Sequence, residues 1–143
     1  MRFWIAFLAA VVLCTTGCNF LSERFHTQKE DPGVIEGLEV APALRYSDIP
    51  VPRGFVYMPK DSWTYEGRGG TRLADLIYKG KAPMQTAVDF FLEQMPISGW
   101  EKEMVVGPET KKRLRFKHTK KSDRCEVILE KRTGATYVQV RIN

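Results

Sequence analysis

Basic side chains gather near the C-terminal end of the chain. Residues 111–132 include ten Lys or Arg and three Asp or Glu, a local charge of +7, compared with +5 for all 143 residues. Successive strand residues point to opposite faces, which places Arg113, Arg115 and Lys117 on one face of a sheet. Such a face can bind anionic headgroups, an acidic protein or an anionic polymer. The alternative is a solvated face that discourages aggregation. The candidate binding residues are Arg113, Arg115, Lys117, Lys120, Lys121 and Arg124.

The first residues of the chain form its most distinctive pattern. Met1-Arg2 is a short positive segment, and the twelve residues from Phe3 to Cys14 are all apolar. As a helix with a rise of about 1.5 Å per residue, this segment spans roughly 18 Å, too short for a hydrocarbon core of about 30 Å. We therefore predict a secretory signal peptide rather than a stable membrane span.

A short motif with a chemically reactive residue follows the apolar segment. Thr15-Thr16-Gly17-Cys18 resembles the lipobox of bacterial lipoproteins. In that family the Cys thiol receives a diacylglyceryl group, the signal is cut before the Cys, and the new amino group is usually acylated. The resemblance implies a signal peptide over residues 1–17 and a lipid anchor on Cys18, and two or three acyl chains hold a protein stably to a bilayer. The alternative is an ordinary cleaved signal peptide with Cys18 as a free thiol.

The residue after Cys18 bears on the destination of the protein. Asp at this position retains lipoproteins in the inner membrane under the enterobacterial sorting rule, and this chain has Asn19. The resemblance therefore implies a lipid-anchored protein of the bacterial cell envelope, with the outer membrane facing the periplasm favoured over the inner membrane.

The third cysteine has no partner for an intrachain disulfide. Cys14 leaves with the signal peptide, and Cys18 is blocked by lipid, which leaves Cys125 alone. Cys125 alternates with Val127 and Leu129 along a predicted strand, so we expect a buried structural thiol.

No pattern for a metal site or a catalytic centre is visible. The two histidines, His26 and His118, have no ligand spacing, and the chain lacks a Gly-x-Ser-x-Gly nucleophile motif. Gly67-Arg68-Gly69-Gly70 precedes a predicted strand rather than a helix, so we predict a hairpin turn and not a phosphate-binding loop. We expect no metal, no cofactor and no enzymatic activity.

The chain is long enough for a single folded domain. Residues 18–45 have no sustained periodicity and are predicted to be the lipidated cysteine and a tether. Residues 46–143 contain 33 large apolar side chains in 98 positions, which suffices for one core. Residues 54–58 and 62–66 are candidates for short strands, and strands are predicted at residues 71–79, 100–106, 112–119, 124–132 and 135–142.

One amphipathic helix is predicted between the third and fourth of these strands. Its apolar stripe consists of Met84, Ala87, Val88, Phe91, Leu92 and Met95. Pro83 suits the first helical position, and Pro96 with Gly99 is expected to end the helix at Met95. Phe90 lies off the stripe. We predict an α+β fold, in which one helix packs on one face of an antiparallel, meander-like sheet of about five to six strands.

The predicted domain carries a second resemblance. Tyr46–Pro52, Gly54-Phe55 and the segment from Phe91 to Trp100 resemble a group of small bacterial envelope lipoproteins of unknown function. The resemblance covers most of residues 46–143 and implies a fold and a compartment, but no catalytic or ligand-binding residue.

These patterns lead us to expect a lipid-anchored envelope protein with a non-enzymatic binding or structural module. Its expected partners are the membrane, through Cys18, and an envelope protein or anionic polymer. Nucleic acid is not expected, because the compartment is wrong and no aromatic residue alternates on the basic face. One alternative is a ligand-binding domain or minor enzyme with a pocket between helix and sheet, lined by Trp63, Tyr65, Trp100 or Phe90. Another alternative is an accessory subunit of a secretion or assembly machine. An exposed apolar stripe that includes Phe90 would favour this alternative.

Overall fold

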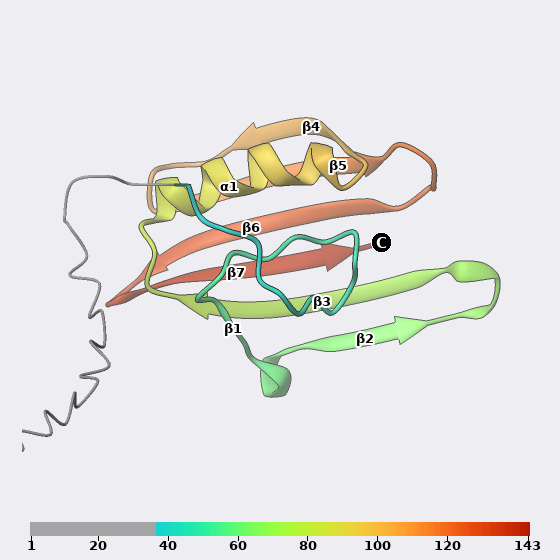
Figure 1. Ribbon diagram of the computed structural model, residues 1–143, viewed down its shortest axis with the longest axis horizontal. Coiled ribbons are helices and arrows are strands. Elements are labelled where there is room, and N and C mark those ends of the chain that lie inside the picture. Colours follow the sequence, from blue (N-terminus) through green and yellow to red (C-terminus); the bar gives the residue numbers. More distant parts are fainter. Residues whose placement is uncertain (1–36) are drawn as a thin grey trace, which may run out of the picture. The chain divides into compact units, whose positions relative to one another are not determined.

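The computed structural model describes residues 37–143 of the chain. Cys18, the predicted signal peptide and the predicted tether up to residue 36 lie outside the described residues. Within the described part, one α-helix and a seven-stranded antiparallel sheet form an α+β fold, as predicted (Figure 1). The elements are β1 (Val56–Tyr57), the 3-10 helix η1 (Pro59–Asp61), β2 (Trp63–Glu66), the 3-10 helix η2 (Arg68–Gly70), β3 (Arg72–Gly80), α1 (Met84–Ile97), β4 (Trp100–Val106), β5 (Lys111–His118), β6 (Arg124–Arg132) and β7 (Ala135–Ile142).

The sheet is a meander that is extended at one edge. β4, β5, β6 and β7 follow one another as antiparallel neighbours, and β3 pairs with β7. Both β1 and β2 pair with the other edge of β3: β1 lies opposite Tyr78 and Lys79, and β2 lies opposite residues 72–75. Because two short strands share this edge, the count is seven, slightly above the five or six that we predicted.

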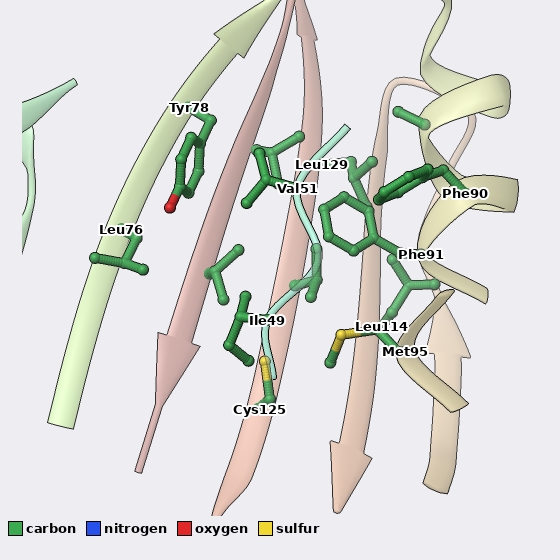
Figure 2. Close-up of a cluster of buried hydrophobic side chains, with 14 of the residues drawn as sticks. Ile49, Val51, Leu76, Tyr78, Phe90, Phe91, Met95, Leu114, Cys125 and Leu129 are labelled. Carbon is green, nitrogen blue, oxygen red and sulfur yellow. The ribbon is translucent and has the colours of Figure 1, made fainter. Parts of the chain in front are cut away.

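One face of the sheet, here called the inner face, is covered by two segments. Helix α1 connects β3 to β4 and packs against the β4 to β6 side of the meander (Figure 1). The segment before β1 covers the part of this face next to the helix. Its residues Ile49 and Val51 are buried against the sheet (Figure 2). The core thus lies between the inner face on one side and the helix and this segment on the other.

Alternation along the strands fills this core. The inner-facing residues of the four central strands are buried, because every second side chain points to the helix side. They include Leu76 and Tyr78 on β3, Val138 and Val140 on β7, Cys125, Val127 and Leu129 on β6, and Leu114, Phe116 and His118 on β5. The predicted burial of Cys125 is confirmed, and His118 is buried as well.

The helix differs from its prediction at both ends. Pro83 is the N-cap, and the helix continues through Pro96 to Ile97 instead of ending at Met95. A proline in the last turn removes a single helical donor, while the Ser98 N–H still bonds the carbonyls of Gln94 and Met95. Gly99, with φ of +90°, then turns the chain into β4.

The folded part also begins earlier than predicted. Leu38, Val40 and Leu44 pack against the core, and the Ala41 N–H donates to the Val51 carbonyl at 2.8 Å. At least part of the segment that we assigned to the tether therefore belongs to the domain, because its apolar side chains help to cover the sheet.

Candidate functional site

The opposite face of the sheet, here called the outer face, carries four of the six predicted basic residues. Arg113, Arg115 and Lys117 alternate with the buried residues of β5, and Arg124 lies opposite Lys117 on β6. Helix α1, the one α-helix of residues 37–143, lies on the inner face (Figure 1).

Strand register arranges charges of alternating sign in one row across the outer face. Arg115, Glu126, Arg141 and Asp75 are successive partners on β5, β6, β7 and β3, and Trp63 on β2 ends the row. Glu126 lies 3.5 Å from Arg115 and 3.9 Å from Arg141, and Arg141 lies 3.3 Å from Asp75. Opposite charges paired across strands stabilise a sheet modestly, so this row is close to neutral.

The neighbouring row is different, because it places like charges side by side. Lys117 and Arg124 are directly opposite each other on β5 and β6, an arrangement that destabilises a sheet. Glu101 on β4 is the partner of Lys117 on its other side. One acid beside two bases leaves an excess of positive charge here, next to Arg115 in the preceding row.

A hollow lies in the outer face beside these residues. It has a volume of about 480 Å³ and is open to solvent. Basic, acidic and apolar outer-face side chains line it together, namely Arg115, Arg124, Arg141, Asp75, Glu126, Leu73 and Trp63. The hollow therefore offers guanidinium donors and one indole ring to a ligand that approaches this face.

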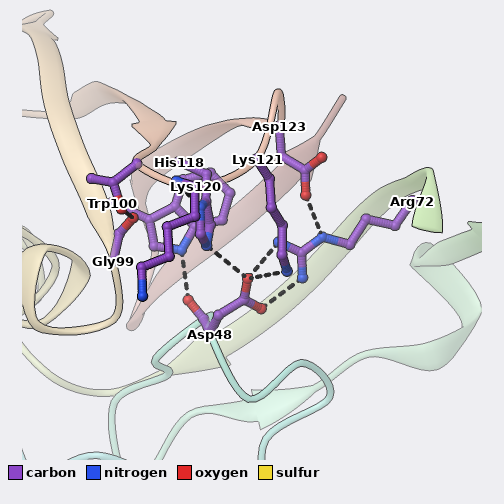
Figure 3. Close-up of polar contacts among 9 residues, drawn as sticks. Asp48, Arg72, Gly99, Trp100, His118, Lys120, Lys121 and Asp123 are labelled. Carbon is purple, nitrogen blue, oxygen red and sulfur yellow. Dashed lines mark hydrogen bonds and ion pairs between the residues drawn. The ribbon is translucent and has the colours of Figure 1, made fainter. Parts of the chain in front are cut away.

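The other two predicted residues belong to the inner side of the sheet. Lys121, in the turn between β5 and β6, places its Nζ 3.6 Å from Oδ2 of Asp48. The Lys120 N–H donates to Nδ1 of His118 at 3.0 Å. The six residues that we grouped from sequence are therefore divided between two sites, because the turn after β5 carries Lys120 and Lys121 away from the outer face (Figure 3).

An ion cluster centred on Arg72 occupies this inner site. Arg72 donates to both carboxylate oxygens of Asp48, at 2.6 and 2.5 Å, and its Nε donates to Asp123 at 2.7 Å. The three side chains are at most 17% exposed. The guanidinium also lies 5.3 Å from the centre of the Tyr46 ring and 5.7 Å from that of Trp100. The cluster ties the segment before β1 to β3 and to the turn before β6.

The electrostatics of the cluster favour the charged forms. Partial burial by itself would raise the pKa of Asp48, but the hydrogen bonds and charge of Arg72, with Lys121, outweigh it and hold that pKa below its ordinary value. Hydrogen bonds to Asp48 and Asp123 raise the pKa of Arg72 in turn. The cluster is therefore a permanent ion network at neutral pH.

The cluster contains groups found in catalytic sites, but their contacts are structural. His118 Nε2 lies 3.8 Å from Asp48, and the His118 ring packs edge-on against Trp100, whose Nε1–H donates to the Asp48 carbonyl at 2.7 Å. Burial raises the pKa of the nearby Cys125 thiol well above its ordinary value. In the part of the chain that the structure describes, no group of three or more His, Cys, Asp or Glu could hold a metal ion.

Sequence reasoning missed Arg72, although one signal was present. Arg72 shares its strand face with Ala74, Leu76 and Tyr78, all of which are buried. A charged residue in register with core residues requires buried partners of opposite charge. Those partners, Asp48 and Asp123, lie 24 and 51 residues away in sequence, so their identity was not visible.

The predicted pocket between helix and sheet is not formed by the residues that we named. Trp100 and Phe90 are buried in the core, at 1% and 3% exposure. Trp63 and Tyr65 lie on the outer face, at the other side of the sheet, and are 53% and 57% exposed. Burial of Phe90 also means that it is not part of an exposed apolar stripe.

Comparisons with known proteins leave the family of the chain open. No family model, no curated protein and no solved structure matches this chain. In residues 37–143, no helix has the length and apolar character needed to cross a bilayer. The resemblance to envelope lipoproteins therefore remains a prediction from the sequence.

Proposed function

We propose that this protein is a lipid-anchored bacterial envelope protein, and that its α+β domain is a non-enzymatic binding module. In this proposal Cys18 carries the lipid, and the outer face of the sheet binds an anionic component of the envelope. The inner face has a different role, since helix α1 and the segment before β1 cover it.

One observation carries the binding part of the proposal. The like-charged pair Lys117 and Arg124 stands next to Arg115 beside an open hollow, on the sheet face opposite α1. Retaining two cations side by side costs stability, and an anion bound between them would offset that cost. The Arg72 cluster offers no such place, because its charges are already paired.

The anchor is tested by membrane fractionation of the whole chain beside a Cys18→Ala variant, with intact-mass analysis of both. We expect the unsubstituted chain to sediment with membranes and to carry the mass of a diacylglyceryl group, and the variant to lose that mass. A mature chain with a bare thiol at Cys18 would contradict the anchor.

The partner is tested by cross-linking and pull-down from the same membranes. Exchange of Arg115, Lys117 and Arg124 for Glu is expected to reduce recovery of an anionic partner and to make the remainder insensitive to salt. Exchange of Lys81 and Lys102 for Glu provides the control. Both are exposed, Lys102 is the strand partner of the inner-facing Phe116, and Lys81 lies beside the start of α1. Equal recovery from all variants would contradict the binding role of this face.

A further inference from the structure

The outer face combines its charges with exposed aromatic side chains. Trp63 and Tyr65 alternate on β2 and both point to the outer face, where more than half of each side chain is exposed. Trp100, in contrast, is fully buried. Trp and Tyr side chains that are partly exposed to water are typical of membrane–water interfaces, where an amphipathic ring lies at the level of the headgroups.

Aromatic and basic residues meet at the same hollow. Trp63 lines it from β2, and Arg115 and Arg124 line it from β5 and β6. The acids that face the hollow, Glu126 and Asp75, are engaged by Arg115 and Arg141 within the neutral row. The register places Trp63 four strands away from Arg115, roughly 19 Å at about 4.8 Å per strand. A phosphate at Arg115 and Arg124 and a glycerol region at Trp63 therefore belong to neighbouring lipids of one bilayer surface.

A lipid on Cys18 would keep the outer face near the membrane, because only a short length of chain separates Cys18 from the described residues. Eighteen residues separate Cys18 from Gly37. Even fully extended, at about 3.5 Å per residue, a chain of that length spans at most roughly 65 Å, so a lipid on Cys18 would keep the domain within that distance of the headgroups. Tethering raises the effective concentration of one surface near another, and a low intrinsic affinity then suffices for docking.

We propose that the outer face docks on the anionic phospholipid headgroups of the bilayer that carries the anchor, with Trp63 and Tyr65 at the interface and Arg115, Lys117 and Arg124 on the phosphates. This inference rests on the proposed function and names the membrane surface as the anionic component. Positive charge and interfacial aromatic rings on one face are complementary to such a surface.

The test uses the mature chain, which begins at Cys18 and lacks Trp4, reconstituted into vesicles with bromine on the acyl chains near the headgroups. One set of vesicles is made of phosphatidylglycerol and the other of phosphatidylcholine. We expect the emission of Trp63 to shift to the blue and to be quenched on phosphatidylglycerol only, and high salt to reverse both effects. A Trp63→Phe variant of this mature chain leaves the buried Trp100 and identifies the share of the signal that Trp63 contributes.

Charge reversal tests the basic residues. A Lys117→Glu/Arg124→Glu variant should lower the docked fraction roughly tenfold or more, because both contacts with phosphate become repulsive. The charge-matched Lys81→Glu/Lys102→Glu variant should dock as the unsubstituted chain does. Circular dichroism of each variant checks that the fold is retained.

Three outcomes would overturn the inference. They are equal Trp63 emission on the two kinds of vesicle, equal loss of docking in both charge-reversed variants, and a dimer that shields Trp63 without lipid. Failure of docking is distinguishable from failure of the anchor. A chain that is lipidated on Cys18 but not quenched contradicts docking alone, whereas quenching on phosphatidylglycerol without a lipid on Cys18 contradicts the anchor alone.

Discussion

Arg72 places a full charge on the apolar face of a strand, and its neighbours explain how the fold tolerates it. Both carboxylates that contact Arg72 come from distant segments, and two aromatic rings lie close to the guanidinium. A largely buried charge without partners would cost several kcal/mol, whereas a fully paired one is tolerated. The cluster therefore couples the segment before β1 to the sheet.

Removal of one charge from this cluster should destabilise the whole domain. We expect Asp48→Asn to lower the free energy of unfolding by about 3 kcal/mol, because Arg72 would keep its charge with only Asp123 beside it. Urea denaturation followed by fluorescence measures the change. The control is Glu39→Gln, which removes an exposed ion pair with Arg53 and should cost about 0.5 kcal/mol or less. Equal effects of the two substitutions would contradict a buried ion cluster.

The same carboxylate predicts a dependence of stability on pH. The pKa of Asp48 in the folded protein lies below its ordinary value of 3.8, so the folded state binds a proton at Asp48 less readily than the unfolded chain does. The stabilising contribution is complete above the unfolded pKa and is lost as pH falls through the lower folded pKa. Urea midpoints between about pH 5 and pH 2 should fall more steeply for the unsubstituted chain than for Asp48→Asn. Parallel curves would assign the acid sensitivity to other groups.

Among the elements, the helix and the four meander strands could be predicted from local patterns. Leu114, Phe116 and His118 alternate with basic residues, and this alternation alone determines which side chains enter the core. The position of β3 beside β7 could not be predicted, because the pairing of Leu76 with Val140 joins residues far apart in sequence, on either side of α1. The predicted helix end at Met95 was wrong, because the one N–H that Pro96 lacks does not outweigh the packing of the last turn, and the helix continues to Ile97.

Residues from distant elements also meet where the segment before β1 crosses the end of β3. A Cβ added at Gly80 would lie 2.6 Å from the ring of Phe55, which packs directly on the strand backbone. We expect Gly80→Ala to lower the free energy of unfolding by about 2 kcal/mol through overpacking. Gly37→Ala is the control, since a Cβ there meets nothing within 4 Å, and its effect should stay within about 0.5 kcal/mol. A neutral Gly80→Ala would show that Phe55 can move aside.

At the scale of the whole molecule, the two faces of the sheet differ in what they carry, and the binding role that we propose belongs to one of them. The inner face holds the core and the Arg72 cluster, and the outer face holds the paired row, the like-charged pair and the exposed aromatic residues. The like-charged pair of the outer face, Lys117 and Arg124, is an arrangement that costs stability. This difference is the reason for placing the binding role on the outer face.

A buried thiol in a central strand allows the cooperativity of the domain to be tested. Cys125 is fully buried on β6, between Phe116 of β5 and Ile142 of β7, so exposing it requires separation of the sheet from its cover. We expect Cys125 to resist a thiol reagent in native buffer and to become reactive in urea with the same midpoint as the fluorescence transition. A Cys125→Ser chain shows which part of the labelling belongs to this residue. Labelling at a lower urea concentration than the fluorescence change would mean that β6 opens separately, and that the helix and the segment before β1 do not close the core as one unit.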